Sequence, residues 1–191
     1  MKSSILEYIV CPTCRSDFRL ITKSKLKNEI KEGTLICTTC NDKFKITKGI
    51  PRFVVDVTKD FVRTEMAFSA KWKNHHRNHH AKDWVNWQKN WFLERFGWKS
   101  IKQFNIFLSS QNFILDAGTG IGNSAKMLSI NKSSTVFALD ASDSIDFAYE
   151  KYGKSSNIHF IQADIRRLPF RKTFFDYIFS DQVLHLSLIH I

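Results

Sequence analysis

The stretch FILDAGTGIG, residues 113–122, decides the fold. Its first three residues, Phe113 to Leu115, are apolar and branched or aromatic, as in a buried strand. Three glycines at alternate positions then allow positive φ and bring the backbone close to a ligand. The next segment, NSAKMLSI at 123–130, predicts a helix. A strand that passes through a glycine turn into a helix holds nucleotide-like ligands in many α/β proteins.

Two ligand classes use such a turn. The dinucleotide fingerprint G-x-G-x-x-G, counted from Gly118, requires a third glycine at position 123, where this chain has Asn123. The spacing here is G-x-G-x-G, with Asp116 two residues before the first glycine. This pattern resembles the first motif of class I methyltransferases that use S-adenosylmethionine (SAM), whose cationic amino-acid end suits a nearby carboxylate. A purely structural glycine turn is the alternative.

Three further segments predict strands: TVFAL at 135–139, NIHFIQA at 157–163 and FFDYIFS at 174–180. Between the first two, 142–152 predicts a helix with Ser142 as its N-cap. In a parallel sheet, the polar residues at the strand ends meet at one edge, where open α/β sheets bind ligands. An acid about 20 residues beyond the glycine turn can accept hydrogen bonds from both ribose hydroxyls. The residues at this edge are Asp116, Asp140, Asp164 and Ser180.

The ordered set DAGTGIG, ALDAS, QADIRRLPF and FDYIFSDQVLH resembles the small-molecule, type 11-like branch of the SAM-dependent methyltransferases over residues 113–185. The resemblance implies an α/β, Rossmann-like parallel sheet, of which the first four strands are present, and methyl transfer by in-line displacement at sulfur. It implies that the methionine part of SAM is held by Asp116, Gly118, Gly120 and Gly122, the ribose by Asp140 beside Ala141, and the adenine by Asp164 and Ile165, with Ser180 at the same edge. No residue is assigned as catalytic, although His185 is a candidate base or orienting group for the acceptor.

All four cysteines fall within the first 40 residues, in two C-x-x-C knuckles at Cys11/Cys14 and Cys37/Cys40. Paired knuckles predict a structural Cys₄ zinc site without an open coordination position. Two disulfides or a redox pair fit less well, because no secretory signal opens the chain and a redox C-x-x-C opens a helix after a strand.

The surrounding segment, residues 1–56, resembles the zinc ribbon of the tRNA-methyltransferase activator family, which implies a folding and docking module. The run SILE at 4–7 predicts a capped short helix, and 18–22 and 34–37 predict strands on either side of a charged loop at 23–32. We expect this ribbon to have its own core, so that Cys37→Ser would unfold it and leave the α/β half intact.

Residues 57–110 form a connector that contains all five tryptophans. One helix face is predicted by the i, i+3, i+7 spacing of Trp84, Trp87 and Trp91, widened by Phe92 and Phe96. A second apolar set consists of Ile101, Phe104, Ile106 and Phe107. Core packing is the predicted role of both sets, and an acceptor pocket is the alternative. The histidine-rich run at 71–80, with His75/His79 and His76/His80 pairs, predicts a solvated linker rather than a metal or phosphate site.

The net charge of +11 is unevenly distributed. Residues 1–56 carry 11 basic and 6 acidic side chains, 57–110 carry 10 and 4, and 111–191 carry 8 and 8. An anionic partner, nucleic acid included, and a merely solvated surface are both consistent with this distribution. No apolar run approaches the length of a membrane span, so we expect a cytoplasmic protein without membrane contact. A small-molecule methyl acceptor is predicted first, with RNA as the alternative.

The last six residues, LSLIHI at 186–191, resemble a translated sequencing adapter, so we expect a C-terminally truncated methyltransferase. A sheet that stops at its fourth strand would expose a backbone edge and an apolar face, which predicts aggregation and no activity. Two other functions are consistent with parts of the sequence: a zinc-ribbon module that docks a partner protein or RNA, and a nucleotide-dependent oxidoreductase, which Asn123 disfavours.

Overall fold

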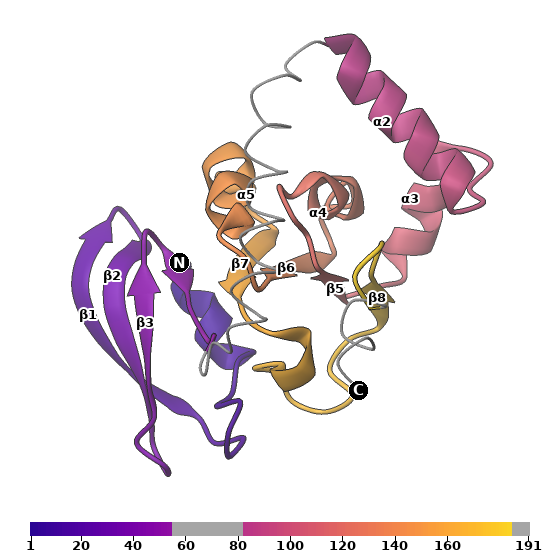
Figure 1. Ribbon diagram of the computed structural model, residues 1–191. Coiled ribbons are helices and arrows are strands. Elements are labelled where there is room, and N and C mark those ends of the chain that lie inside the picture. Colours follow the sequence, from indigo (N-terminus) through magenta and orange to yellow (C-terminus); the bar gives the residue numbers. More distant parts are fainter. Residues whose placement is uncertain (55–81, 185–191) are drawn as a thin grey trace.

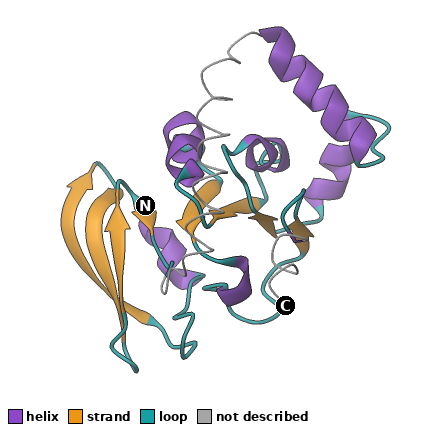
Figure 2. Cartoon of the chain, in the orientation of Figure 1, coloured by secondary structure: helices purple, strands orange, loops and turns teal. Residues whose placement is uncertain are grey.

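The computed structural model describes residues 1–54 and 82–184, with 82–88 as backbone only (Figure 1). The antiparallel sheet contains β1 (Phe18–Leu26), β2 (Glu29–Cys37), β3 (Lys43–Thr47) and β4 (Ile50–Pro51), preceded by the 3₁₀ helix η1 (Ser3–Glu7). The parallel sheet contains β5 (Phe113–Ala117), β6 (Thr135–Asp140), β7 (Ile158–Gln162) and β8 (Tyr177–Phe179). The other helices are α2 (Lys82–Arg95), α3 (Ile101–Ser109), α4 (Asn123–Leu128), α5 (Ser144–Tyr152) and η2 (Ile165–Arg167) (Figure 2). None of these described helices is long and apolar enough to cross a membrane.

The parallel sheet confirms the predicted fold class. Its strand order is β7-β6-β5-β8, and all three ladders are parallel. The carboxyl ends of the strands therefore lie at one edge, as the sequence predicted for the polar residues there.

Helices cover one face of this sheet. Alternate strand residues such as Ile114, Val136 and Ala138 are fully buried in a cluster with Phe104 of α3 and Ile145 of α5. In Figure 1, α4 and α5 lie above the sheet, and α3 lies beside β8. This layer is the usual packing of helices on a parallel sheet.

The zinc-ribbon half covers the opposite face. Leu115, Phe137 and Ile161 belong to one buried cluster with Ile5 and Phe53 of the N-terminal half. The expectation of separate cores is therefore wrong, because a sheet this small needs a partner for its apolar face and finds one in the parallel sheet. For the same reason, the sheet face that we expected to be bare is covered in part by the ribbon.

The two halves are also joined by backbone. Arg52, just after β4, forms a parallel bridge with Gln162 at the end of β7. The Phe53 N–H donates to the Gln162 carbonyl at 2.7 Å. The Arg52 guanidinium donates to Asp146 at 2.9 Å and to the Gln162 side chain at 2.8 Å. The ribbon thus extends the free edge of the parallel sheet at β7.

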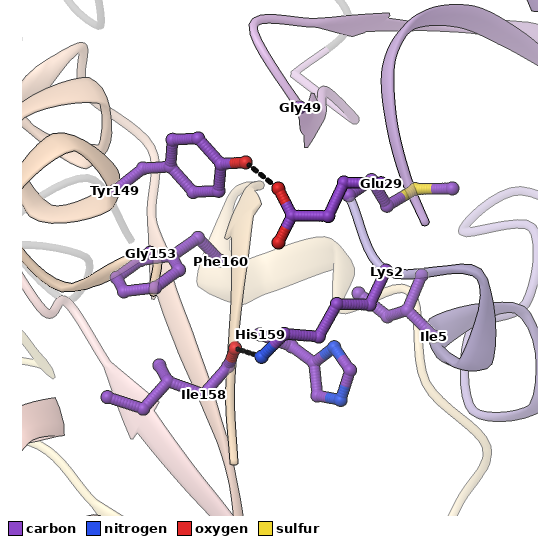
Figure 3. Close-up of a pocket in the computed structure, with 10 residues that line it drawn as sticks. Lys2, Ile5, Glu29, Gly49, Tyr149, Gly153, Ile158, His159 and Phe160 are labelled. Carbon is purple, nitrogen blue, oxygen red and sulfur yellow. Dashed lines mark hydrogen bonds between the residues drawn. The ribbon is translucent and has the colours of Figure 1, made fainter. Parts of the chain in front are cut away.

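Polar side chains form further contacts between the ribbon and the parallel half. Lys2 Nζ donates to the Ile158 carbonyl at 2.9 Å, and the Tyr149 hydroxyl donates to Glu29 at 2.9 Å (Figure 3). Burial alone would raise the pKa of Glu29, but hydrogen bonds from Lys31 and Tyr149 bring it below its usual value. The small cleft in Figure 3, of about 250 Å³ with open solvent included, lies between these residues near the start of β7. It is part of the contact between the halves and lies away from the carboxyl edge of the sheet.

Acid should weaken this contact through His159. The His159 ring stacks on Phe137 at 5.3 Å, and burial, Lys2 and the N-terminal amine lower its pKa to about 4. Between the usual pKa of about 6.5 and this value, the unfolded chain binds a proton that the folded chain does not. The free energy of unfolding therefore decreases as the pH is lowered through this range. We expect the wild type to lose about 2 kcal/mol more between pH 7 and pH 5 than His159→Phe, measured by urea unfolding. Equal losses in the two proteins would show that His159 is not responsible.

Several local predictions need correction. Residues 23–32 are not a loop, because β1 and β2 continue to a tight turn at Lys27, whose φ is 54°. The short N-terminal helix is a 3₁₀ helix without a side-chain cap. Ser142 is not the N-cap of α5, because Asp143 occupies that position and the Ser142 hydroxyl donates to Asp140.

Two helices lie within the predicted connector. Helix α2 includes the predicted stripe, but Trp91 is 38% exposed and Ile106 of α3 is 63% exposed. Phe92 and Phe104, which belong to the same two predicted sets, are buried as expected. The side chains of Trp84 and Trp87, the run 71–80 with its histidine pairs, His185 and residues 186–191 lie outside the described residues.

Candidate cofactor and metal sites

The glycine turn between β5 and α4 has the predicted left-handed backbone. Gly118, Gly120 and Gly122 have φ values of 86°, 54° and 83°. The N–H groups of Gly118 and Thr119 both donate to the Leu139 carbonyl, at 2.8 and 2.9 Å, and Gly122 N–H donates to the Thr119 carbonyl at 2.9 Å. Gly120 N–H donates to the Asp140 carboxylate at 2.7 Å. These four amides are committed within the protein, so they are not offered to a phosphate.

Close packing explains two of the glycines. A Cβ on Gly118 would lie 2.2 Å from Cγ2 of Val183, which follows β8. A Cβ on Gly122 would lie 2.9 Å from the Ala148 Cβ of α5. The turn therefore needs glycine both for its φ values and for the approach of two neighbouring segments.

Asp116 lies beneath the turn. Its side chain is 1% exposed, accepts a hydrogen bond from the Thr119 hydroxyl, and has its pKa raised to about 7 by burial. In this conformation the carboxylate holds the turn in place. Its role toward the amino-acid end of SAM stays a prediction.

Asp140 joins the turn to the end of β6. One carboxylate oxygen accepts from Gly120 N–H, and the other accepts from the N–H and the hydroxyl of Ser142, at 2.9 and 2.6 Å. A carboxylate has about four acceptor positions, so one remains for a ribose hydroxyl. The Ser142 hydroxyl also lies 2.5 Å from the Ser144 hydroxyl. If it rotated to donate to Ser144, a second acceptor position of Asp140 would become free.

Asp164 stands next to Asp140, because the Ala163 N–H donates to the Asp140 carbonyl at 3.0 Å. Its carboxylate accepts from the N–H of Arg166 at 2.8 Å and pairs with the Arg166 guanidinium. Burial alone would raise the pKa of Asp164, but its hydrogen bonds with Arg166 hold it below its usual value. An adenine amino group would have to share this carboxylate with Arg166 or displace it.

The remaining predicted residues lie at the same edge. The Ser180 hydroxyl donates to the Ala117 carbonyl at 3.0 Å, which ties the end of β8 to β5. Ala141 follows β6, and its carbonyl accepts from the Gln162 amide at 3.1 Å. Ile165 begins η2 directly after Asp164.

The four cysteines converge. Their sulfur atoms all lie within 4.8 Å of one another, with Cys14 3.3 Å from Cys37 and 3.5 Å from Cys40. Four thiolates around zinc at about 2.3 Å would be roughly 3.8 Å apart, so the donors suit a tetrahedral zinc ion. Hydrogen bonds from Ser16 lower the pKa of Cys14 to about 6, whereas burial raises the pKa of Cys11.

The first knuckle is anchored to the parallel half. Arg15 follows Cys14 with φ 68° and donates to the carbonyls of Leu168 and Phe170, at 2.7 and 3.1 Å. On the other side of the knuckle, Val10 N–H donates to the Pro169 carbonyl at 2.9 Å. The LPF run before β8 is thus held between residues that flank the zinc ligands.

Sequence reasoning missed three contributors to the site. Ser142 and Arg166 each stand two residues after an aspartate, the spacing of an Asx turn, and this signal could have placed them. Val183 against Gly118 could not be found in this way, because the contact joins segments that are far apart in sequence.

The strand order, the glycine turn and the acids at the strand ends are those of a Rossmann-like α/β domain. Residues 114–190 match the family model described as "Methyltransferase domain", and residues 2–49 match that of "Trm112p-like protein". A UPF0434 protein of Blochmanniella pennsylvanica is 36% identical over 62 residues, which are 32% of this chain and 98% of that protein. By this match the chain belongs to the UPF0434 protein family.

Solved structures give a partial match. A SAM-dependent methyltransferase from Aquifex aeolicus is 23% identical, with a TM-score of 0.37 over 42% of this chain and 47% of that one. The Haemonchus contortus phosphoethanolamine N-methyltransferase 1 is 20% identical, with a TM-score of 0.40 over 66% of this chain and 27% of that one. Human N-acetylserotonin methyltransferase is 17% identical, with a TM-score of 0.34 over 66% of this chain and 43% of that one. The chain thus spans less than half the length of each of these enzymes.

Proposed function

We propose that this chain carries a SAM-binding domain that serves the transfer of a methyl group to a small-molecule acceptor. The observation that carries the proposal is the glycine turn, whose Gly120 N–H is bound by the carboxylate of Asp140 at the neighbouring strand end. This arrangement presents a half-buried carboxylate, rather than free amides, to a ligand at the edge. It suits a ribose and an amino-acid group better than a pyrophosphate.

In this proposal, Asp140 orients the ribose, Asp164 and the backbone of Ile165 orient the adenine, and the turn at 118–122 accommodates the methionine part. SAM would supply the electrophilic methyl group, and the protein would act chiefly by positioning. Zinc at the four cysteines would be structural, because four thiolates leave no open coordination position.

The alternative, a ribbon that docks a separate partner, is less well supported. The inner face of the ribbon is already buried against the parallel sheet of the same chain. Docking through that face would require the two halves to separate first.

Asp140→Asn should weaken SAM binding by about 2 kcal/mol, roughly 30-fold in Kd, because it removes a charged acceptor from the ribose. Isothermal titration calorimetry with SAM measures this change. Glu150→Gln is the matched control, since it neutralises an exposed carboxylate on α5. Equal SAM affinity in the two variants would contradict the role assigned to Asp140.

A further inference from the structure

The outward face of the ribbon sheet is basic. Cross-strand pairing places Arg19 opposite Ile36 and Ile36 opposite Lys43, and it places Ile21 opposite Thr34 and Thr34 opposite Lys45. Of these six residues, Arg19, Lys43 and Lys45 are exposed cations and none is acidic. Their strand neighbours Leu20, Leu35 and Phe44 point to the buried face.

These cations differ from the basic residues that face the parallel half. The latter are all bonded: Lys2 to backbone carbonyls, Arg15 to Leu168 and Phe170, Lys31 to Glu29, and Lys48 and Arg52 to Asp146. Within residues 1–54 and 82–184, Arg19, Lys43 and Lys45 have no carboxylate within ion-pair distance. Their charge therefore does not serve the fold and is available to an anionic partner.

The geometry suits an extended polyanion. Arg19 on β1 is separated by β2 from Lys43 and Lys45 on β3. The usual spacing between strands puts β1 and β3 roughly 10 Å apart. Lys43 and Lys45 are about 7 Å apart along their strand. Thr34, which offers a hydroxyl, lies between these two strands on β2, whereas Ile21, which is 45% exposed, is on β1 two residues after Arg19.

We propose that this face, defined by Arg19, Ile21, Thr34, Ile36, Lys43 and Lys45, binds the backbone of single-stranded RNA. The major groove of duplex DNA admits a two-stranded β-ribbon, whereas this sheet has four strands, and sheet surfaces do receive single-stranded RNA. The Thr34 hydroxyl can meet a ribose 2′-hydroxyl, and Ile21 can pack against a sugar or base. Because the face contains no aromatic side chain for stacking, binding depends on phosphate contacts and is weakly sequence-specific.

The test compares the variant Arg19→Gln/Lys43→Gln/Lys45→Gln with the control Lys102→Gln/Lys154→Gln/Lys172→Gln. The control removes the same charge from exposed positions of the parallel half. Binding of a labelled mixed-sequence RNA 20-mer is followed by fluorescence anisotropy from 50 to 200 mM salt. We expect the ribbon variant to bind on the order of tenfold more weakly at 50 mM and its log–log salt slope to fall by about 2, with the control near wild type.

Equal RNA affinity in the two triple variants would overturn the proposal, as would wild-type binding to phosphatidylserine vesicles but not to RNA. Tighter binding of the same sequence as single-stranded DNA would contradict the role of the 2′-hydroxyl. Zinc content and melting temperature establish that each variant is folded. SAM titration on the same samples keeps this result separate from the proposed function, since RNA binding and SAM binding can each fail alone.

Discussion

Removal of zinc should unfold both halves of the chain. Structural zinc contributes about 10–16 kcal/mol to the folding of small zinc domains, which is as large as the whole stability of an ordinary domain. Because Ile5 and Phe53 share a buried cluster with Phe137, loss of the ribbon would expose one face of the parallel sheet. The Arg15 bonds to Leu168 and Phe170 would be lost as well.

Cys37→Ser tests this expectation without a chelator. We expect hydrogen exchange of the β6 amides to accelerate together with that of β2, and the thermal transition to disappear. Thr38→Ser, at the next position, keeps its hydroxyl and should behave as wild type with a full zinc content. Normal protection of β6 in a protein that has lost zinc would show that the parallel half is stable alone.

Gly118→Val should abolish SAM binding and destabilise the chain by about 4 kcal/mol. A β-branched residue at φ 86° is strained, and its Cβ would lie 2.2 Å from Cγ2 of Val183. The clash includes the Cβ of Val183 at 2.9 Å, so a rotation of that side chain alone cannot relieve it. Urea unfolding and SAM titration measure the two effects.

Gly97→Val separates strain from packing. Gly97 also has positive φ, 73°, but nothing lies within 4 Å of its added Cβ. We expect it to cost only about 1–2 kcal/mol and to leave SAM binding unchanged. Adding Val183→Ala to Gly118→Val should recover part of the lost stability, and no recovery would exclude the contact with Val183 as the cause.

The parallel sheet could be predicted from the sequence because its signals are local. Each strand is a short apolar run that ends in a polar residue, and FILDAGTGIG specifies the turn. Asp140 and Asp164 were placed at the correct edge, because parallel strands bring their carboxyl ends together. The paired knuckles identified the four cysteines for the same reason, since their spacing is itself the signal.

The relation between the halves could not be predicted. It depends on Arg15 reaching carbonyls about 150 residues away and on Arg52 pairing with Gln162, and no local pattern encodes such contacts. The sequence pattern predicts a self-contained ribbon, whereas the buried face of the ribbon continues the core of the parallel sheet. The predicted core position of Trp91 is wrong, because the i, i+3, i+7 pattern identifies a helix face but does not show what covers that face.

The most direct test of the central claim is calorimetric titration of the zinc-loaded chain with SAM and, separately, with NAD. We predict one SAM bound per chain, displaced by S-adenosylhomocysteine, weakened by Asp140→Asn and unchanged by Glu150→Gln, with no heat from NAD. Binding of NAD in place of SAM, or the absence of SAM binding to a folded chain, would contradict the assignment of the glycine turn as a SAM site.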